Sequence, residues 1–140
     1  MTNTRRLVAF LAIGLVVASI LGGFFLIGTP GDQRTLRFDE RRLSDLRGIV
    51  NAIDTYATRH GALPDNLGAL VADPLSDVTA TTDPETGAPY DYGVVDTRSY
   101  QLCADFGAAS PDTTYAPDGF RHPRGHYCFT LTANGEPAGD

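Results

Sequence analysis

The sequence predicts an α+β protein in which an N-terminal transmembrane helix precedes an amphipathic helix packed on a small antiparallel sheet. Three observations predict this fold. Residues 7–27 carry no charge, apolar residues then recur at spacings of three and four as far as His60, and strand-like segments follow after residue 89. A chain of 140 residues has room for one small domain beyond the apolar segment.

The apolar segment at residues 7–27 predicts a transmembrane anchor. A helix of this length, at about 1.5 Å per residue, spans roughly 30 Å, which is the thickness of a hydrocarbon core. A cleaved signal peptide would have a shorter apolar core followed by small residues at the cleavage site. We therefore expect a retained single-pass anchor in the inner or plasma membrane, with residues 1–6 in the cytoplasm.

The charges predict where the rest of the chain lies. Arg5 and Arg6 precede the apolar segment, whereas residues 34–47 contain five arginines, so a bare count of positive charges would favour the opposite orientation. Long domains cross the membrane largely regardless of charge, however, and two cysteines suit an oxidising compartment. We expect residues 28–140 to be periplasmic or extracellular. Residues 61–140 carry three arginines and twelve carboxylates, which disfavours nucleic acid as a partner.

A juxtamembrane kink or linker is expected at residues 28–35, where Thr29 can cap a new helix and Pro30 can occupy its first position. The domain itself is expected at residues 36–132, beginning with an amphipathic helix over residues 36–60. Gly61 follows as a residue suited to ending a helix. Residues 133–140 are expected to form a disordered tail.

Three charged residues of the amphipathic helix are assigned to its outer face. Asp39, Arg42 and Asp54 lie off the main apolar stripe, so we expect them to face solvent and to form a contact surface for protein partners in the cell envelope.

A second, short helix is expected after residue 64. Asp65 can cap it, Leu67, Leu70 and Val71 are spaced to share one face, and Asp73 with the following proline ends it.

Three strands are expected at residues 90–95, 99–106 and 126–131, joined into one antiparallel sheet. In the second strand Tyr100, Leu102, Ala104 and Phe106 alternate with more polar positions, so one face can cover the amphipathic helix. Residues 107–125 are rich in Pro, Gly, Ser and Asp and are expected to form a long loop.

The two cysteines, Cys103 and Cys128, each lie in a predicted strand, and pairing of these strands would bring the sulfurs together. A disulfide is the expected outcome in an exported domain. Closing a loop of this length stabilises a domain by roughly 3 kcal/mol in the chain-entropy model.

Two metal sites are weaker alternatives. Cys103, His122, His126 and Cys128 offer two sulfurs and two imidazoles for zinc, although an oxidising compartment competes for both thiolates.

Calcium is the second metal alternative. Asp105, Asp112 and Asp118 offer hard oxygen ligands in or beside the long loop, without the spacing of an EF-hand. No other cofactor is expected.

The sequence gives no reason to expect an enzyme. His60, His122 and His126 could each serve as a base, but no Gly-x-Ser-x-Gly elbow or comparable motif accompanies them. No catalytic residue is therefore assigned.

Two motifs resemble those of the major pseudopilins of type II secretion and related type IV pilin-like proteins. The first is HGALP at residues 60–64, and the second is DPETGAPYDY at residues 83–92. In that family the helix ends at a Gly-x-x-Pro turn, and an Asp-Pro-x-Gly-x-Pro-Tyr segment leads into the sheet. The resemblance covers residues 36–106 and implies a helix packed on a small antiparallel sheet. The prepilin peptidase motif of the family is absent from this sequence.

The resemblance implies a structural or interaction component of a secretion or pilus-like assembly. The alternative is a tethered periplasmic module that binds calcium or another small ligand in the loop at residues 107–125.

Overall fold

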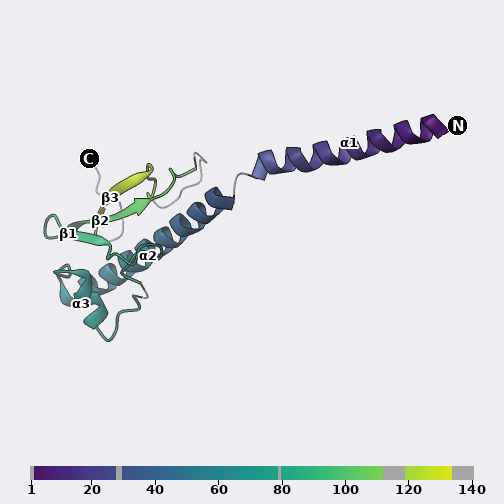
Figure 1. Cartoon of the computed structure of the whole chain (residues 1–140). Coiled ribbons are helices and arrows are strands. Elements are labelled where there is room, and N and C mark those ends of the chain that lie inside the picture. The colour runs from purple at the N-terminus through teal and green to yellow at the C-terminus, as the bar shows by residue number, and fades with distance from the viewer. Residues whose placement is uncertain (1, 28–29, 79, 112–118, 134–140) are drawn as a thin grey trace. The chain divides into compact units, whose positions relative to one another are not determined.

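The computed structural model describes residues 2–27, 30–78, 80–111 and 119–133. The chain divides into two compact units, Met1–Arg34 and Thr35–Asp140. Three helices precede three strands along the chain (Figure 1). The result is the predicted α+β layout of an apolar N-terminal helix, further helices and a small antiparallel sheet.

Helix α1 spans Thr2–Ile27. Its segment Asn3–Gly23 has a mean hydropathy of 2.1 and none of it is buried, so α1 is long and apolar enough to cross a membrane. Ser19, one of its few polar residues, donates its hydroxyl to the carbonyl oxygen of Leu15 within the same helix, at 2.8 Å. This hydrogen bond satisfies the hydroxyl without a partner from outside the helix.

Helix α2 spans Pro30–His60. It begins with proline at its first position, as expected, so residues 30–35 are helical where the sequence predicted a kink or linker. Residues 28 and 29, including the predicted cap Thr29, lie outside the described residues. At the other end, Gly61 has φ of 70° and its N–H donates to the carbonyl oxygen of Ala57 at 2.8 Å. The predicted end of the helix is thereby confirmed.

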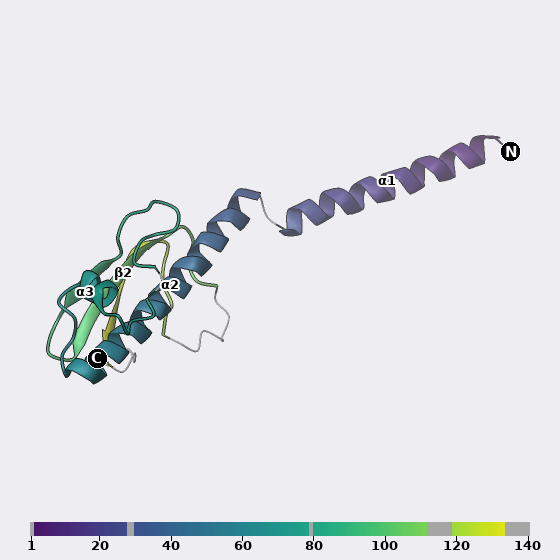
Figure 2. The ribbon, with the colours of Figure 1, turned by 90° about the horizontal axis from the view of Figure 1, so that it is seen from below.

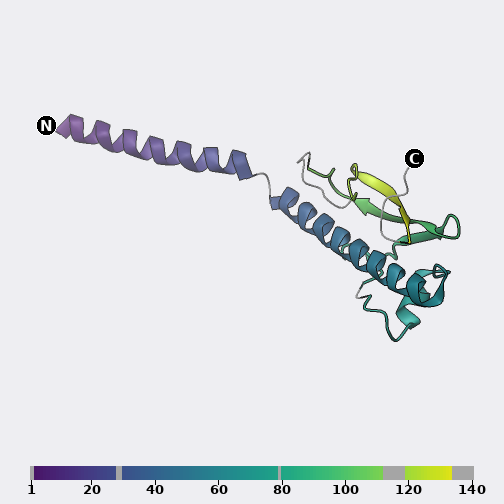
Figure 3. The same ribbon diagram turned by 180° about the vertical axis from the view of Figure 1, so that it is seen from behind.

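The sheet contains strands β1 (Asp91–Val94), β2 (Ser99–Phe106) and β3 (Gly125–Thr132) in the order β1-β2-β3, with both pairs antiparallel. Helix α2 runs along one face of this sheet (Figures 2 and 3). The predicted second strand has the observed bounds, and the observed first and third strands differ from the predicted ones only at their ends.

The core lies between α2 and the sheet. Leu46, Ile49 and Ile53 of α2 are completely buried and belong to one cluster with residues of β2 and β3. In β2 the predicted core face is confirmed, because Tyr100, Leu102, Ala104 and Phe106 are buried. On the other face Gln101 and Asp105 are exposed as predicted, whereas Cys103 is buried as well. The other face of β2 is therefore available for polar chemistry.

Helix α3 spans Leu67–Ala72 and adds Leu67 and Leu70 to the core. Its cap is Asn66, whose Oδ1 accepts a hydrogen bond from the N–H of Ala69 at 3.0 Å, so the predicted cap Asp65 is wrong by one residue. Val71, expected to share the buried face, is exposed. A helix of fewer than two turns can turn only a few side chains towards the core, and here these are Leu67 and Leu70.

Replacing Leu46 with alanine should destabilise the domain by about 2–5 kcal/mol, because the substitution leaves a cavity at a completely buried position. The matched control is Leu75→Ala, since Leu75 is 68% exposed, and it should change stability by less than about 0.5 kcal/mol. Urea unfolding of the full chain in detergent micelles, followed by near-ultraviolet circular dichroism of the tyrosines, measures both. Equal effects of the two substitutions would contradict the assigned core.

Candidate functional site

The guanidinium of Arg42 lies at the centre of a buried polar cluster, and the side chain of Arg42 is 3% exposed. Its Nε and Nη2 donate to the two carboxylate oxygens of Asp83 at 2.5 and 3.1 Å. Nη1 donates to Asp39 at 2.8 Å, and Nη2 also donates to Glu85 at 2.7 Å. We call these four residues the Arg42 cluster. The planar fork of arginine suits such two-point pairing with a carboxylate.

Asp83 also organises the turn in which it lies. Its Oδ1 accepts hydrogen bonds from the N–H groups of Glu85 and Thr86, both at 2.8 Å. Its own carbonyl oxygen accepts from the N–H of Gly87 at 2.9 Å, and Gly87 has φ of 73°, which favours glycine. The turn therefore presents its carboxylate to Arg42 in a fixed orientation.

The environment of Asp83 changes its acidity. Burial by itself would raise the pKa of Asp83, but the hydrogen bonds from Arg42 and from the turn lower it to about 2. The hydrogen bonds that Arg42 donates to Asp83 raise the pKa of Arg42 despite burial. Because the pKa of Asp83 is lowered on folding, its contribution to stability is present at neutral pH and is lost as the pH falls from about 4 towards 2.

Asp39 extends the Arg42 cluster to a third segment. Its two carboxylate oxygens accept hydrogen bonds from the N–H groups of Gly107 and Ala108, at 3.0 and 2.9 Å. These two residues directly follow β2. A Cβ atom on residue 107 would collide with the side-chain methyl of Thr35, so glycine permits this close approach. The cluster therefore joins α2 to the Asp83 turn and to the end of β2.

The predicted outward position of Asp39 and Arg42 is wrong, because both residues are buried. Positions 39, 42, 46, 49 and 53 follow one another at helical spacing, and the buried stripe of α2 runs through all of them. The sequence does carry this signal, an Asp and an Arg three residues apart in line with the apolar stripe. Their partners on distant segments were not visible in it.

Asp54, the third residue assigned to the outer face, is half-buried. Its Oδ1 is buried and has no hydrogen-bond partner among the described residues, and the same is true of the Tyr100 hydroxyl. Burial raises the pKa of Asp54 to about 6.

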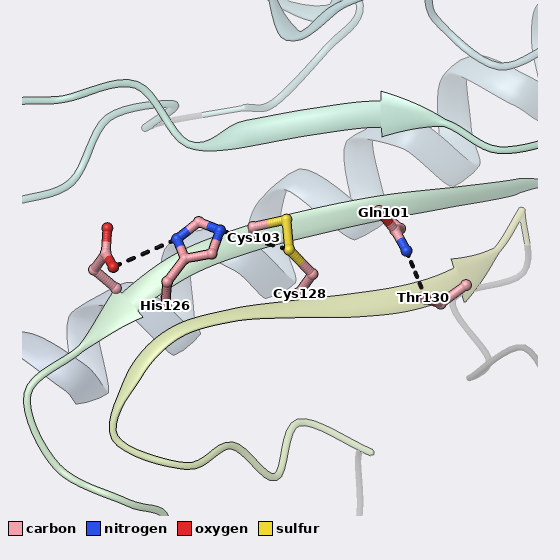
Figure 4. Close-up of a disulfide and its surroundings, with 6 residues drawn as sticks. Gln101, Cys103, His126, Cys128 and Thr130 are labelled. Atoms are coloured by element: carbon pink, nitrogen blue, oxygen red, sulfur yellow. Dashed lines mark hydrogen bonds and ion pairs between the residues drawn. A yellow bond between two sulfur atoms is a disulfide. The ribbon is translucent and has the colours of Figure 1, made fainter.

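On the opposite face of the sheet, Cys103 and Cys128 form directly paired positions of β2 and β3 (Figure 4). Their sulfurs are 2.08 Å apart, in agreement with the predicted disulfide. His126 lies beside them, with Nε2 at 3.7 Å from Sγ of Cys128 and Nδ1 at 3.4 Å from the carboxylate of Asp105. The structure thus brings together four residues that the sequence analysis had divided between two metal sites.

The predicted zinc set is not assembled in full, because His122 does not join it. His122 is buried, its ring stacks on Phe106 with centroids 3.5 Å apart, and its Nδ1 lies 3.1 Å from the carbonyl oxygen of Pro123. His126 belongs to β3, whereas His122 precedes that strand and packs into the core. Although His122 and His126 are only four positions apart in the sequence, their imidazoles therefore lie in different surroundings and do not form one site.

The calcium prediction remains a prediction. Asp105 faces His126, and Asp112 and Asp118 lie outside the described residues.

A hollow of about 360 Å³ lies where the end of α2 meets residues that flank β2 and β3. Arg98 is the one ionisable residue among those that line it, so this lining offers no acid and base pair: Ala57, Thr58, Gly61, Ala62, Leu63, Thr97, Arg98 and Ala133. His60 stacks on Tyr56 with ring centroids 4.1 Å apart and lies 3.6 Å from Asp73.

No protein-family model, curated protein or solved structure matches the chain. The resemblance to pseudopilins therefore rests on the two sequence motifs, and its functional meaning is a proposal.

Substituting Arg42 with methionine should destabilise the domain by about 3–5 kcal/mol, because it leaves buried carboxylates without their cation. Arg41→Met is the matched control, since Arg41 is the exposed neighbour on the same helix, and it should change stability by less than about 0.5 kcal/mol. Chemical unfolding at pH 7 measures both. A stability loss shared by the two variants would contradict the assigned role of the cluster.

Asp54→Asn should alter how stability depends on pH. Because folding raises the pKa of Asp54 from about 3.9 to about 6, the unfolded chain loses this proton first, and stability falls as the pH rises through that window. The variant should lack this fall and be more stable than the parent by about 1 kcal/mol at pH 7.5, after allowance for partial exposure. Urea midpoints from pH 3.5 to 7.5 test this, with the exposed Asp77→Asn as the control. If the urea midpoint of Asp54→Asn differed from that of the parent by the same amount at every pH, the predicted pH dependence would be contradicted.

Proposed function

We propose that this chain is a membrane-anchored, pseudopilin-like protein whose domain contributes a protein-binding surface to a cell-envelope assembly of the secretion or pilus kind. The observation that carries the proposal is an exposed apolar helix, α1, preceding a domain in which α2 packs on a three-stranded antiparallel sheet. In this proposal the domain lies outside the cytoplasm and acts as a scaffold.

The exposed surface of α1 supports membrane anchoring. Its large apolar side chains are roughly half or more exposed, from Leu7 at 63% to Leu21 at 58%. Contiguous apolar surface of this extent is unfavourable in water and is covered by lipid or by a partner. A span of 21 residues, Asn3–Gly23, suits the length of a single membrane crossing.

The two resembling motifs occupy structural positions that support a pseudopilin-like domain. The first motif contains Gly61, which ends α2, and Pro64, whose carbonyl oxygen accepts the hydroxyl of Tyr92 at 2.9 Å. The second contains the Asp83 turn and leads into β1 through Tyr90. The buried Tyr90 donates its hydroxyl to Asp45 of α2 at 3.0 Å. Both motifs therefore hold the sheet against the helix.

The exposed face of α2 is the proposed contact surface, in place of the buried Asp39 and Arg42. Arg37, Arg41, Ser44, Asn51 and Thr55 are exposed and recur at helical spacing along the side of α2 away from the core. Arg37 and Arg41 make one end of this surface basic, and the remaining residues are polar. A partner whose surface carries mixed or negative charge would complement it.

Site-specific photocrosslinking in native membranes tests the proposal. With the probe at Arg41, Ser44 or Asn51, we expect adducts to components of a secretion or pilus-like machine. Thr130 is the matched control position, because it is exposed on the opposite face of the sheet. The absence of specific adducts from α2, or equal adducts from Thr130, would contradict the proposed surface. It would favour the tethered ligand-binding alternative instead.

A further inference from the structure

The face of the sheet that points away from α2 carries an ordered group of side chains. Asp91, Cys103 and Cys128 lie in register across β1, β2 and β3, and Asp105 and His126 form the neighbouring pair. Residues directly opposite each other in an antiparallel pair share a face, and so do residues two apart along a strand. The register therefore places five residues able to bind metals on one surface, and Figure 4 shows Cys103, His126 and Cys128 among them.

Three of these residues bring potential ligand atoms together, and the two Sγ atoms, which are bonded to each other at 2.08 Å, must move apart before both can bind one ion. The Sγ atoms of Cys103 and Cys128 and a ring nitrogen of His126 all lie within 4.8 Å of one another. Nε2 of His126 is 3.7 Å from Sγ of Cys128. Zinc bonds of about 2.0–2.1 Å to nitrogen and 2.3 Å to sulfur put two tetrahedral ligands roughly 3.5 Å apart. His126 is therefore already placed as a ligand.

The surroundings of His126 support this role. Asp105 contacts its Nδ1, so the second ring nitrogen faces the sulfurs. A carboxylate on the outer nitrogen of a histidine ligand orients the ring and raises its basicity. A hollow of about 30 Å³ borders Cys103, Asp105 and His126 and also Asp91. This volume accommodates one water molecule, which could complete a four-coordinate site.

We propose that reduction of the Cys103–Cys128 disulfide converts this face of the sheet into a zinc site with Cys103, Cys128 and His126 as ligands. A dithiol reductant supplies two electrons and two protons. Its own thiols become a disulfide, and the bond between the two Sγ atoms is replaced by two thiols. Zinc then displaces the two thiol protons to solvent and is bound by two thiolates, the imidazole and one water. Asp105 positions His126, and Asp91 adds negative charge beside the ion.

The site is gated by the redox state of the cysteines. In the disulfide the two sulfurs are bonded to each other and carry no thiolate charge, so zinc binding should be absent or far weaker in the oxidised protein. This inference goes beyond the proposed scaffold function and does not depend on it.

Metal titration of the full chain in detergent micelles tests the proposal. The protein is reduced with dithiothreitol, desalted without oxygen and titrated first with Co²⁺, then with Zn²⁺ as competitor. We expect one equivalent of Co²⁺ to produce a thiolate-to-cobalt charge-transfer band that Zn²⁺ abolishes, and the oxidised protein to show none. His126→Gln should weaken Zn²⁺ binding at least tenfold, and Asp105→Ala by about 10- to 100-fold. His60→Gln, a histidine exposed to a similar degree at the end of α2, should bind like the parent.

Each of three results would overturn the proposal: no binding by the reduced protein, equal binding by the oxidised protein, or unchanged affinity in His126→Gln. Circular dichroism reports whether the reduced domain keeps its fold. If the fold is lost on reduction, Zn²⁺ should restore that of the parent and not that of His126→Gln, since metal binding and folding are coupled. Failure of Zn²⁺ to restore the parent would overturn the proposal equally.

Discussion

The ion pairs and hydrogen bonds of the buried Arg42 guanidinium join α2 to the Asp83 turn and, through Asp39, to the end of β2. The completely buried apolar residues of α2 begin at Leu46, and in the turns before it Asp39 and Arg42 bond to the Asp83 turn and to the end of β2. One cation faces three carboxylates, and backbone N–H groups of Glu85, Thr86, Gly107 and Ala108 supply the remaining hydrogen bonds. Buried charges are tolerated when paired and hydrogen-bonded in this way.

The sheet serves two purposes because the side chains of a strand alternate between its faces. In β2, Tyr100 and Leu102 enter the core, whereas Cys103 and Asp105 belong to the face that carries the disulfide and His126. The disulfide joins β2 and β3 at directly paired positions, so it reinforces a small sheet of three strands. The same register brings His126 to the cysteines.

The two units of the chain place different demands on their surroundings. The apolar surface of α1 needs lipid or a protein partner, whereas the domain buries its own apolar residues around α2 and exposes polar ones. A small folded domain with a polar helix face, attached to an apolar helix, is suited to presenting a surface near a membrane. These two properties are what the proposed assembly role requires, whereas the domain core accounts only for the fold.

The sequence by itself determined the features that depend on local periodicity. These are the apolar span, the end of α2 at His60, the alternation of β2 and the pairing of Cys103 with Cys128, since each follows from spacings within one element or between two recognisable strands. Only the tertiary structure decided that Asp39 and Arg42 point inward, because Asp83 and Glu85, which pair with Arg42, lie more than forty residues away. It likewise decided that His126 and not His122 joins the cysteines. Helical and strand periods assign a side chain to a face, but a distant partner decides whether a charged or polar group can be buried there.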